Sequence, residues 1–79
     1  MSLDIRDFMK VGDTVEINPL GTLSHVYGKI VSFDTNNPQK IEVKLTSPYL
    51  LFRKIQADIG DVKIFHGWDV VSVNGKMIR

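Results

Sequence analysis

The amino-acid sequence predicts a mainly β fold: a small barrel of five or six bent antiparallel strands, a short N-terminal helix, and a candidate helix over residues 48–59. Two observations predict this fold. Short runs rich in β-branched and aromatic residues recur along the chain, and turn residues separate them. The run at residues 26–34 is apolar on both faces, which is typical of a central strand or of one that bends between two layers of a closed sheet.

Residues 2–9 are predicted to form the N-terminal helix. Ser2 can cap it, Asp4 suits the positive end of its first turn, and one side is apolar. The apolar residues of that side are Ile5, Phe8 and Met9. A helix of about two turns is not stable alone, so it is expected to dock on the barrel.

The first strand is predicted over residues 11–17, with Val11, Val15 and Ile17 on one face and with Asp13 and Glu16 nearer solvent. Residues 20–24 then connect it to the strand at residues 26–34.

The strand at residues 26–34 carries Val26 and Ile30 on one face and three larger apolar residues on the other. Those three are Tyr27, Val31 and Phe33. Gly28 is the expected site of a bend, because glycine tolerates bulge and corner geometry.

Residues 40–46 form the clearest predicted strand, because apolar and charged residues alternate along it. Ile41, Val43 and Leu45 are expected to face inward. The turn at residues 36–38 makes this strand and the preceding one a hairpin.

Two interpretations are possible for residues 47–60, a helix or a strand. As a helix, Ser47 is the N-cap, Pro48 takes the first position and Gly60 ends the helix. The apolar stripe is then Leu51, Phe52, Ile55 and Ile59. As a strand, Leu51 and Ile55 face inward with Arg53 between them, so the local pattern favours the helix.

The last third predicts strands at residues 62–65 and 69–73, joined by the short link His66-Gly67-Trp68. Asn74-Gly75 is a strong two-residue hairpin signal that leads into residues 76–78. Strands of this length and spacing predict a small barrel, SH3-like in the broad sense or OB-like.

The 79 residues predict a single domain over 1–79, with no cysteine to form disulfides or thiolate metal sites. A domain of this size buries a limited core, so self-association is an expected source of stability. The net charge of +1 gives no overall attraction to polyanions. With no apolar run of the ~20 residues that span a bilayer and no signal peptide, a cytoplasmic location is expected.

Two segments resemble the conserved motifs of the Sm/Lsm-like proteins. Residues 14–17 and 28–34 resemble the first motif, in which a glycine-opened strand ends in aspartate and an asparagine follows. Residues 64–73 resemble the second, with His66-Gly67 in the place of its arginine-glycine pair. Gly-x-Val-x-x-x-Asp also occurs in other small barrels, including KOW domains.

The resemblance implies a bent five-stranded barrel that closes a homo-oligomeric ring through its edge strands and binds single-stranded RNA, or DNA, in RNA or DNA processing or metabolism. The two motif loops are then the binding residues: Asp34, Asn36, Asn37, His66 and Gly67. Arg53 and Lys54, near Tyr49 and Phe52, form the only basic-aromatic cluster and are the candidate phosphate contacts.

The same residues can also have ordinary structural roles. Asp34 and Asn37 can close a hairpin as an Asx turn, and His66 can be a polar turn residue. Trp68 can cap a barrel end or act as a stacking platform or interface anchor. Arg53 and Lys54 can form an ordinary solvated face.

No catalytic constellation is present, so neither an enzyme nor a cofactor is predicted. The two histidines have no ligand partners at metal-binding spacing, and Asp58 and Asp61 have no nucleophile or histidine near them in sequence. Two rival functions remain. One is an SH3- or KOW-like protein adaptor docking through Trp68, Tyr49 and Phe52, and the other is a structural ring subunit without nucleic-acid binding.

Overall fold

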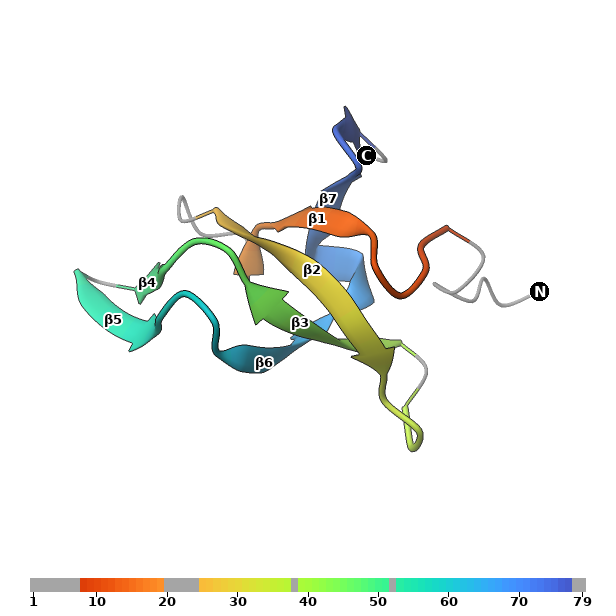
Figure 1. The fold of residues 1–79 in the computed structure, drawn as a ribbon, viewed down its shortest axis with the longest axis horizontal. Helices are drawn as coiled ribbons and strands as arrows, with labels where there is room; N and C mark the ends of the chain where they lie inside the picture. The colour runs from red at the N-terminus through yellow and green to blue at the C-terminus, as the bar shows by residue number, and fades with distance from the viewer. Residues whose placement is uncertain (1–7, 20–24, 38, 52, 78–79) are drawn as a thin grey trace.

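The computed structural model describes residues 8–19, 25–37, 39–51 and 53–77, and these residues are almost entirely β (Figure 1). The strands are β1 (Thr14–Ile17), β2 (Val26–Phe33), β3 (Lys40–Leu45), β4 (Tyr49–Leu51), β5 (Lys54–Ala57), β6 (Val62–His66), β7 (Val70–Val73) and β8 (Lys76–Met77). A 3-10 turn, Gly67–Asp69, joins β6 to β7. The predicted mainly β class is therefore confirmed, with eight strands described instead of five or six.

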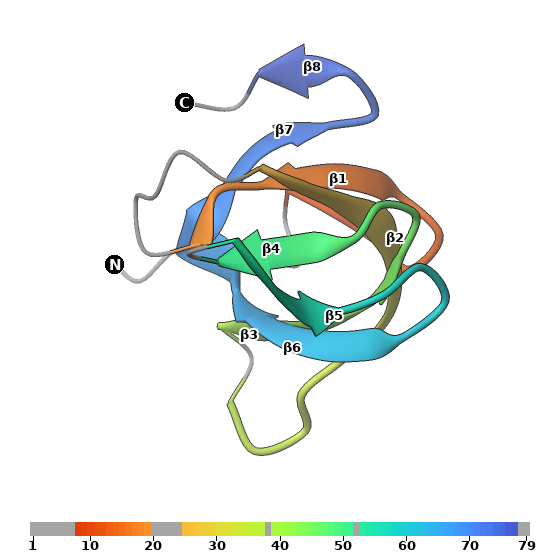
Figure 2. The same cartoon turned by 90° about the vertical axis from the view of Figure 1, so that its left-hand side faces the viewer.

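All strand pairs are antiparallel. Six strands form one sheet in the order β6-β3-β2-β1-β7-β8, and β4 and β5 form a separate hairpin. Figure 2 shows β1, β2, β3 and β6 following one another around the molecule, with the β4–β5 hairpin across the end that faces the viewer. The described part of the chain contains no helix long and apolar enough to cross a membrane.

The core is built from alternate residues of the strands. In β3, Ile41, Val43 and Leu45 are buried and Lys44 is exposed, as the alternation predicts. The other buried apolar residues are Met9, Val15, Ile17, Val26, Ile30, Ala57, Phe65, Val70 and Val73. Each fully buried aliphatic side chain contributes about 1.5–3 kcal/mol through removal of its surface from water.

β2 is a central strand, as predicted, because it pairs with β1 on one side and with β3 on the other. Its Gly28 is required by packing: a Cβ at this position would lie 2.4 Å from Val43 Cγ1 and 2.6 Å from the Lys44 carbonyl oxygen. The register runs through Gly28 without interruption, so no β-bulge lies at this position. The register shift lies between Ile30 and Ser32 instead.

The first strand is shorter than predicted. It begins at Thr14, because Lys10 to Asp13 form a turn in which the Asp13 amide donates to the Lys10 carbonyl at 3.0 Å. Gly12 has a positive φ of 95° in this turn. Val11 is therefore 60% exposed instead of facing the core.

The helix predicted over residues 2–9 lies outside the described residues except for its last two positions. Phe8 is in a turn and Met9 is non-helical, and Met9 is buried in the core. The predicted connection at residues 20–24 also lies outside the described residues.

The prediction of a helix over residues 48–59 is wrong, because this segment forms the β4–β5 hairpin. Arg53 turns the chain with a φ of +64°, which no right-handed helix accommodates. Tertiary contacts favour the hairpin over the local helical pattern: Ala57 is buried, and the Tyr49 ring packs 5.7 Å from the Phe65 ring. Ile55, a member of the predicted stripe, is 66% exposed.

The predicted hairpin at Asn74-Gly75 is confirmed. Both residues have positive φ, 52° and 83°, as a two-residue turn of this type requires, and β7 pairs with β8 across them. The Asn74 side chain also accepts a hydrogen bond from the Thr14 amide at 3.0 Å, which ties this turn to β1. The preceding strand begins at Val70 instead of the predicted Asp69, which belongs to the 3-10 turn.

Candidate functional site

The loop that joins β2 to β3, residues 34–39, is organised by the Asp34 side chain. Its Oδ1 accepts the backbone amides of Asn36 at 2.8 Å and Asn37 at 3.3 Å. The Asn37 side chain in turn accepts the Gln39 amide at 3.0 Å. These are Asx-type contacts, so the hairpin-closing role of Asp34 and Asn37 is present.

The second candidate loop lies directly beside the first. His66 ends β6 opposite Lys40 at the start of β3, and the Gly67 amide donates to the Gln39 carbonyl at 2.7 Å. Residues about 30 positions apart in the sequence therefore form one surface, because the register of β3 and β6 aligns the ends of both strands. The structure brings together the two loops that the Sm-like resemblance implies.

An aromatic stack forms part of this surface. The rings of His66 and Trp68 are nearly parallel, with 9° between their planes and 4.3 Å between their centroids. Trp68 is 50% exposed, whereas His66 is half-buried and its Nδ1 has no hydrogen-bond partner in the described part of the chain. Ring stacking, and not a hydrogen bond at Nδ1, therefore supports the imidazole. We call His66 and Trp68 the aromatic platform.

Arg53 and Lys54 are not part of this surface. Arg53 lies in the turn between β4 and β5, Lys54 begins β5, and both are exposed. Figure 1 shows this hairpin on the opposite side of the molecule from the yellow-green loop that joins β2 to β3. The seven predicted binding residues thus separate into a five-residue loop surface and a distant basic pair.

The aromatic residues predicted near that basic pair do not form a cluster with it. The Tyr49 ring packs against Phe65 and the core, and Phe52 lies outside the described residues. Trp68 is consequently the one member of the predicted adaptor surface that the structure describes as exposed.

The remaining polar residues have structural roles. In the turn after β5, Asp61 Oδ2 accepts the Asp58 amide at 2.8 Å, and Asp58 Oδ1 accepts the Ile59 amide at 2.7 Å. His25 Nδ1 lies 2.6 Å from Glu16 Oε2. Within the described residues, no three histidine, cysteine or carboxylate side chains are grouped so that they could hold a metal ion.

Comparisons of the chain with protein-family models, with curated proteins and with solved structures gave no match.

Proposed function

We propose that this chain is a non-catalytic, Sm-like binding module that takes up single-stranded nucleic acid, with RNA as the preferred ligand. The observation that supports it is the aromatic platform, exposed beside the structured loop of residues 34–39. Unstacked bases bind proteins chiefly by stacking on aromatic side chains, each worth about 1–3 kcal/mol, and by hydrogen bonds to their edges.

The loop beside the platform offers groups for such edge contacts. Asn36 is exposed at its tip, and the Lys40 side chain begins at its end, opposite His66. Asp34 and Asn37 would then act indirectly, because their side-chain oxygens hold the loop backbone. In this proposal a base stacks on Trp68, and His66 supports the indole from its other face. Asn36 contacts the edge of the base, and Lys40 contacts the adjacent phosphate.

The Sm-like barrel type belongs to the same proposal. Five strands form a continuous antiparallel series in which β7 returns beside β1, and this order suits a bent five-stranded barrel. The five are β1, β2, β3, β6 and β7. The proposal includes a cytoplasmic location and a role in RNA or DNA metabolism.

Assembly into a ring is proposed through the free sheet edges. Among the described strands β6 pairs with β3 alone, and its Val62 and Ile64 are 51% and 54% exposed. An edge strand presents unpaired amide and carbonyl groups, and repeating one head-to-tail contact around a closed ring satisfies them in every subunit.

Fluorescence anisotropy with labelled oligo(U) and oligo(A) tests nucleic-acid binding. We expect saturable binding that weakens steeply with salt, because phosphate contacts release counterions. Trp68→Ala should weaken it by about 1–3 kcal/mol, the usual contribution of one stacked base. Tyr27→Ala is the matched control, since Tyr27 is 44% exposed on β2 and lies outside the two loops. Equal losses in both variants, or no binding by the unmodified protein, would contradict the proposal.

The exposure of Trp68 also favours a second candidate, a protein adaptor that uses the indole as its anchor. A near-neutral net charge suits this function. The adaptor candidate predicts a monomer and no retention of oligonucleotides, whereas the preferred function predicts both an oligomer and retention.

A further inference from the structure

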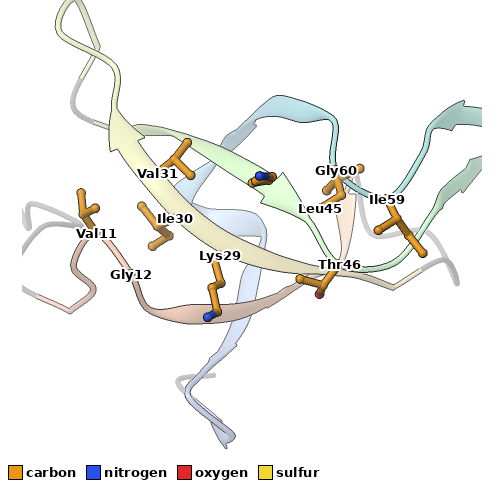
Figure 3. A pocket seen from close by; sticks show the side chains of 10 residues that line it. Val11, Gly12, Lys29, Ile30, Val31, Leu45, Thr46, Ile59 and Gly60 are labelled. Carbon is orange, nitrogen blue, oxygen red and sulfur yellow. The ribbon is translucent and has the colours of Figure 1, made fainter.

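A groove of about 510 Å³ lies over β2 and β3, away from the aromatic platform. Figure 3 shows Val11 and Ile59 on opposite sides of the groove, with β2 crossing between them and Lys29 projecting from that strand. The surface that lines the groove is almost entirely apolar. Its residues are Val11, Gly12, Lys29, Ile30, Val31, Lys44, Leu45, Thr46, Ile59 and Gly60.

Two anchored turns form the sides of the groove. On one side, the Gly12 amide donates to the Ile30 carbonyl at 2.8 Å, which fixes the turn that carries Val11. On the other, the Gly60 amide donates to the Leu45 carbonyl at 2.9 Å, which fixes the turn that carries Ile59. Both turns extend the hydrogen bonding of the sheet, so the groove is preformed. Its volume lies within the roughly 300–1,000 Å³ that is typical of small-ligand sites.

Two lysines line the groove, and their positive charges favour a ligand with a negative charge. Lys29 and Lys44 lie directly opposite each other in the β2–β3 register, and like charges in this arrangement repel. Both are exposed, and neither forms an ion pair with any residue that the structure describes. An anion between the two ammonium groups would remove this repulsion.

The carboxylates nearest in sequence to the groove walls are already engaged. Asp13 accepts the Lys10 amide at 2.8 Å and the Asn74 side-chain amide at 3.2 Å. Asp61 accepts the Asp58 amide within its own turn. These carboxylates therefore stabilise the two turns, which leaves the lysine pair as the charged feature of an otherwise apolar groove.

We propose that this groove binds a small amphipathic carboxylate, with its apolar chain against Val11, Val31 and Ile59 and its carboxylate between the ammonium groups of Lys29 and Lys44. The apolar walls supply the hydrophobic part of the affinity, and the lysine pair selects an anionic head group. This site is independent of the proposed nucleic-acid surface, because it uses neither the 34–39 loop nor the aromatic platform.

Decanoate, used below the concentration at which it forms micelles, is the probe. Titration calorimetry and amide chemical shifts of the full chain should show saturable binding, with shifts centred on residues 29–31, 44–46 and 59–60. Lys29→Ala and Lys44→Ala should each weaken binding on the order of tenfold or more, since each removes a charged hydrogen-bond donor. Lys63→Ala is the matched control, because Lys63 is exposed on β6 outside the groove.

The variant Lys44→Glu distinguishes a loss of decanoate binding from a loss of folding. It places opposite charges across the hairpin, so the protein should be at least as stable as the parent while decanoate binding is lost. Decanol and decyltrimethylammonium, with matched chains, should bind more weakly than decanoate. Equal binding of all three probes, an unchanged affinity in the Lys29 and Lys44 variants, or shifts elsewhere would overturn the proposal. Saturation by an acidic apolar peptide with no response to decanoate would also overturn it, since the occupant would then be a protein.

Discussion

At the scale of single residues, Gly28 shows how one position permits the sheet to form. Its missing side chain lets the β3 backbone and Val43 approach to distances at which a Cβ would overlap them. A glycine in a strand is unfavourable by itself, so this close approach gives a physical reason for its presence at the centre of the sheet.

Gly28→Ala is therefore expected to destabilise the protein by about 1–3 kcal/mol, the usual cost of overpacking a core. Urea denaturation followed by circular dichroism measures this change. Thr46→Ala, at an exposed position just after β3, should change the free energy of unfolding by no more than about 0.5 kcal/mol. A Gly28→Ala protein as stable as the parent would mean that β2 and β3 are not packed as described.

The residues of the candidate site were predictable to different degrees. Asp34 and Asn37 stand in a recognisable Asx-turn pattern, because the interactions that place them are local. The contact of Gly67 with Gln39 depends on the register of β3 against β6, which no local pattern contains. The opposition of Lys29 and Lys44 also depends on register, so the groove was not predicted.

At the scale of elements, alternation predicted β3 well, because this strand buries one face against the core. The strand at β2 was also predicted, but its second apolar face is largely exposed: Tyr27 is 44% and Val31 40% exposed. For residues 47–60 the favoured helix was wrong and the strand alternative was closer, since the apolar spacing suits a helix while the tertiary environment favours a hairpin. The positive φ of Arg53 and the burial of Ala57 are consequences of tertiary structure. Neither can be predicted from the spacing of the apolar residues in this segment.

The edge strand β6 is the element on which the proposed ring depends. Ile64→Lys adds a charge to its exposed apolar face and should dissociate the assembly, a standard protection of sheet edges. Multi-angle light scattering should give an oligomer for the parent and a monomer for this variant. Tyr27→Lys, at an exposed position on β2, should leave the mass unchanged, because this strand is already paired on both sides. A monomeric parent protein would contradict the ring.

At the scale of the whole molecule, the fold separates two surfaces with different chemistry. The aromatic platform and the 34–39 loop lie where β2, β3 and β6 end or begin, whereas the apolar groove lies over the middle of β2 and the far end of β3. A small core supports both, and the near-neutral net charge means that affinity for an anionic ligand must come from local groups.

Trp68, the only tryptophan in the chain, can report base stacking through its own fluorescence. Stacking of a base on this indole should change its fluorescence, so titration with unlabelled oligo(U) should quench the emission in a saturable way, with the same midpoint as the anisotropy titration. His66→Ala should weaken this quenching, because it removes the ring that supports Trp68. Tryptophan emission that stays constant while the oligonucleotide binds, or an absence of binding, would contradict the claim that the aromatic platform is the nucleic-acid site.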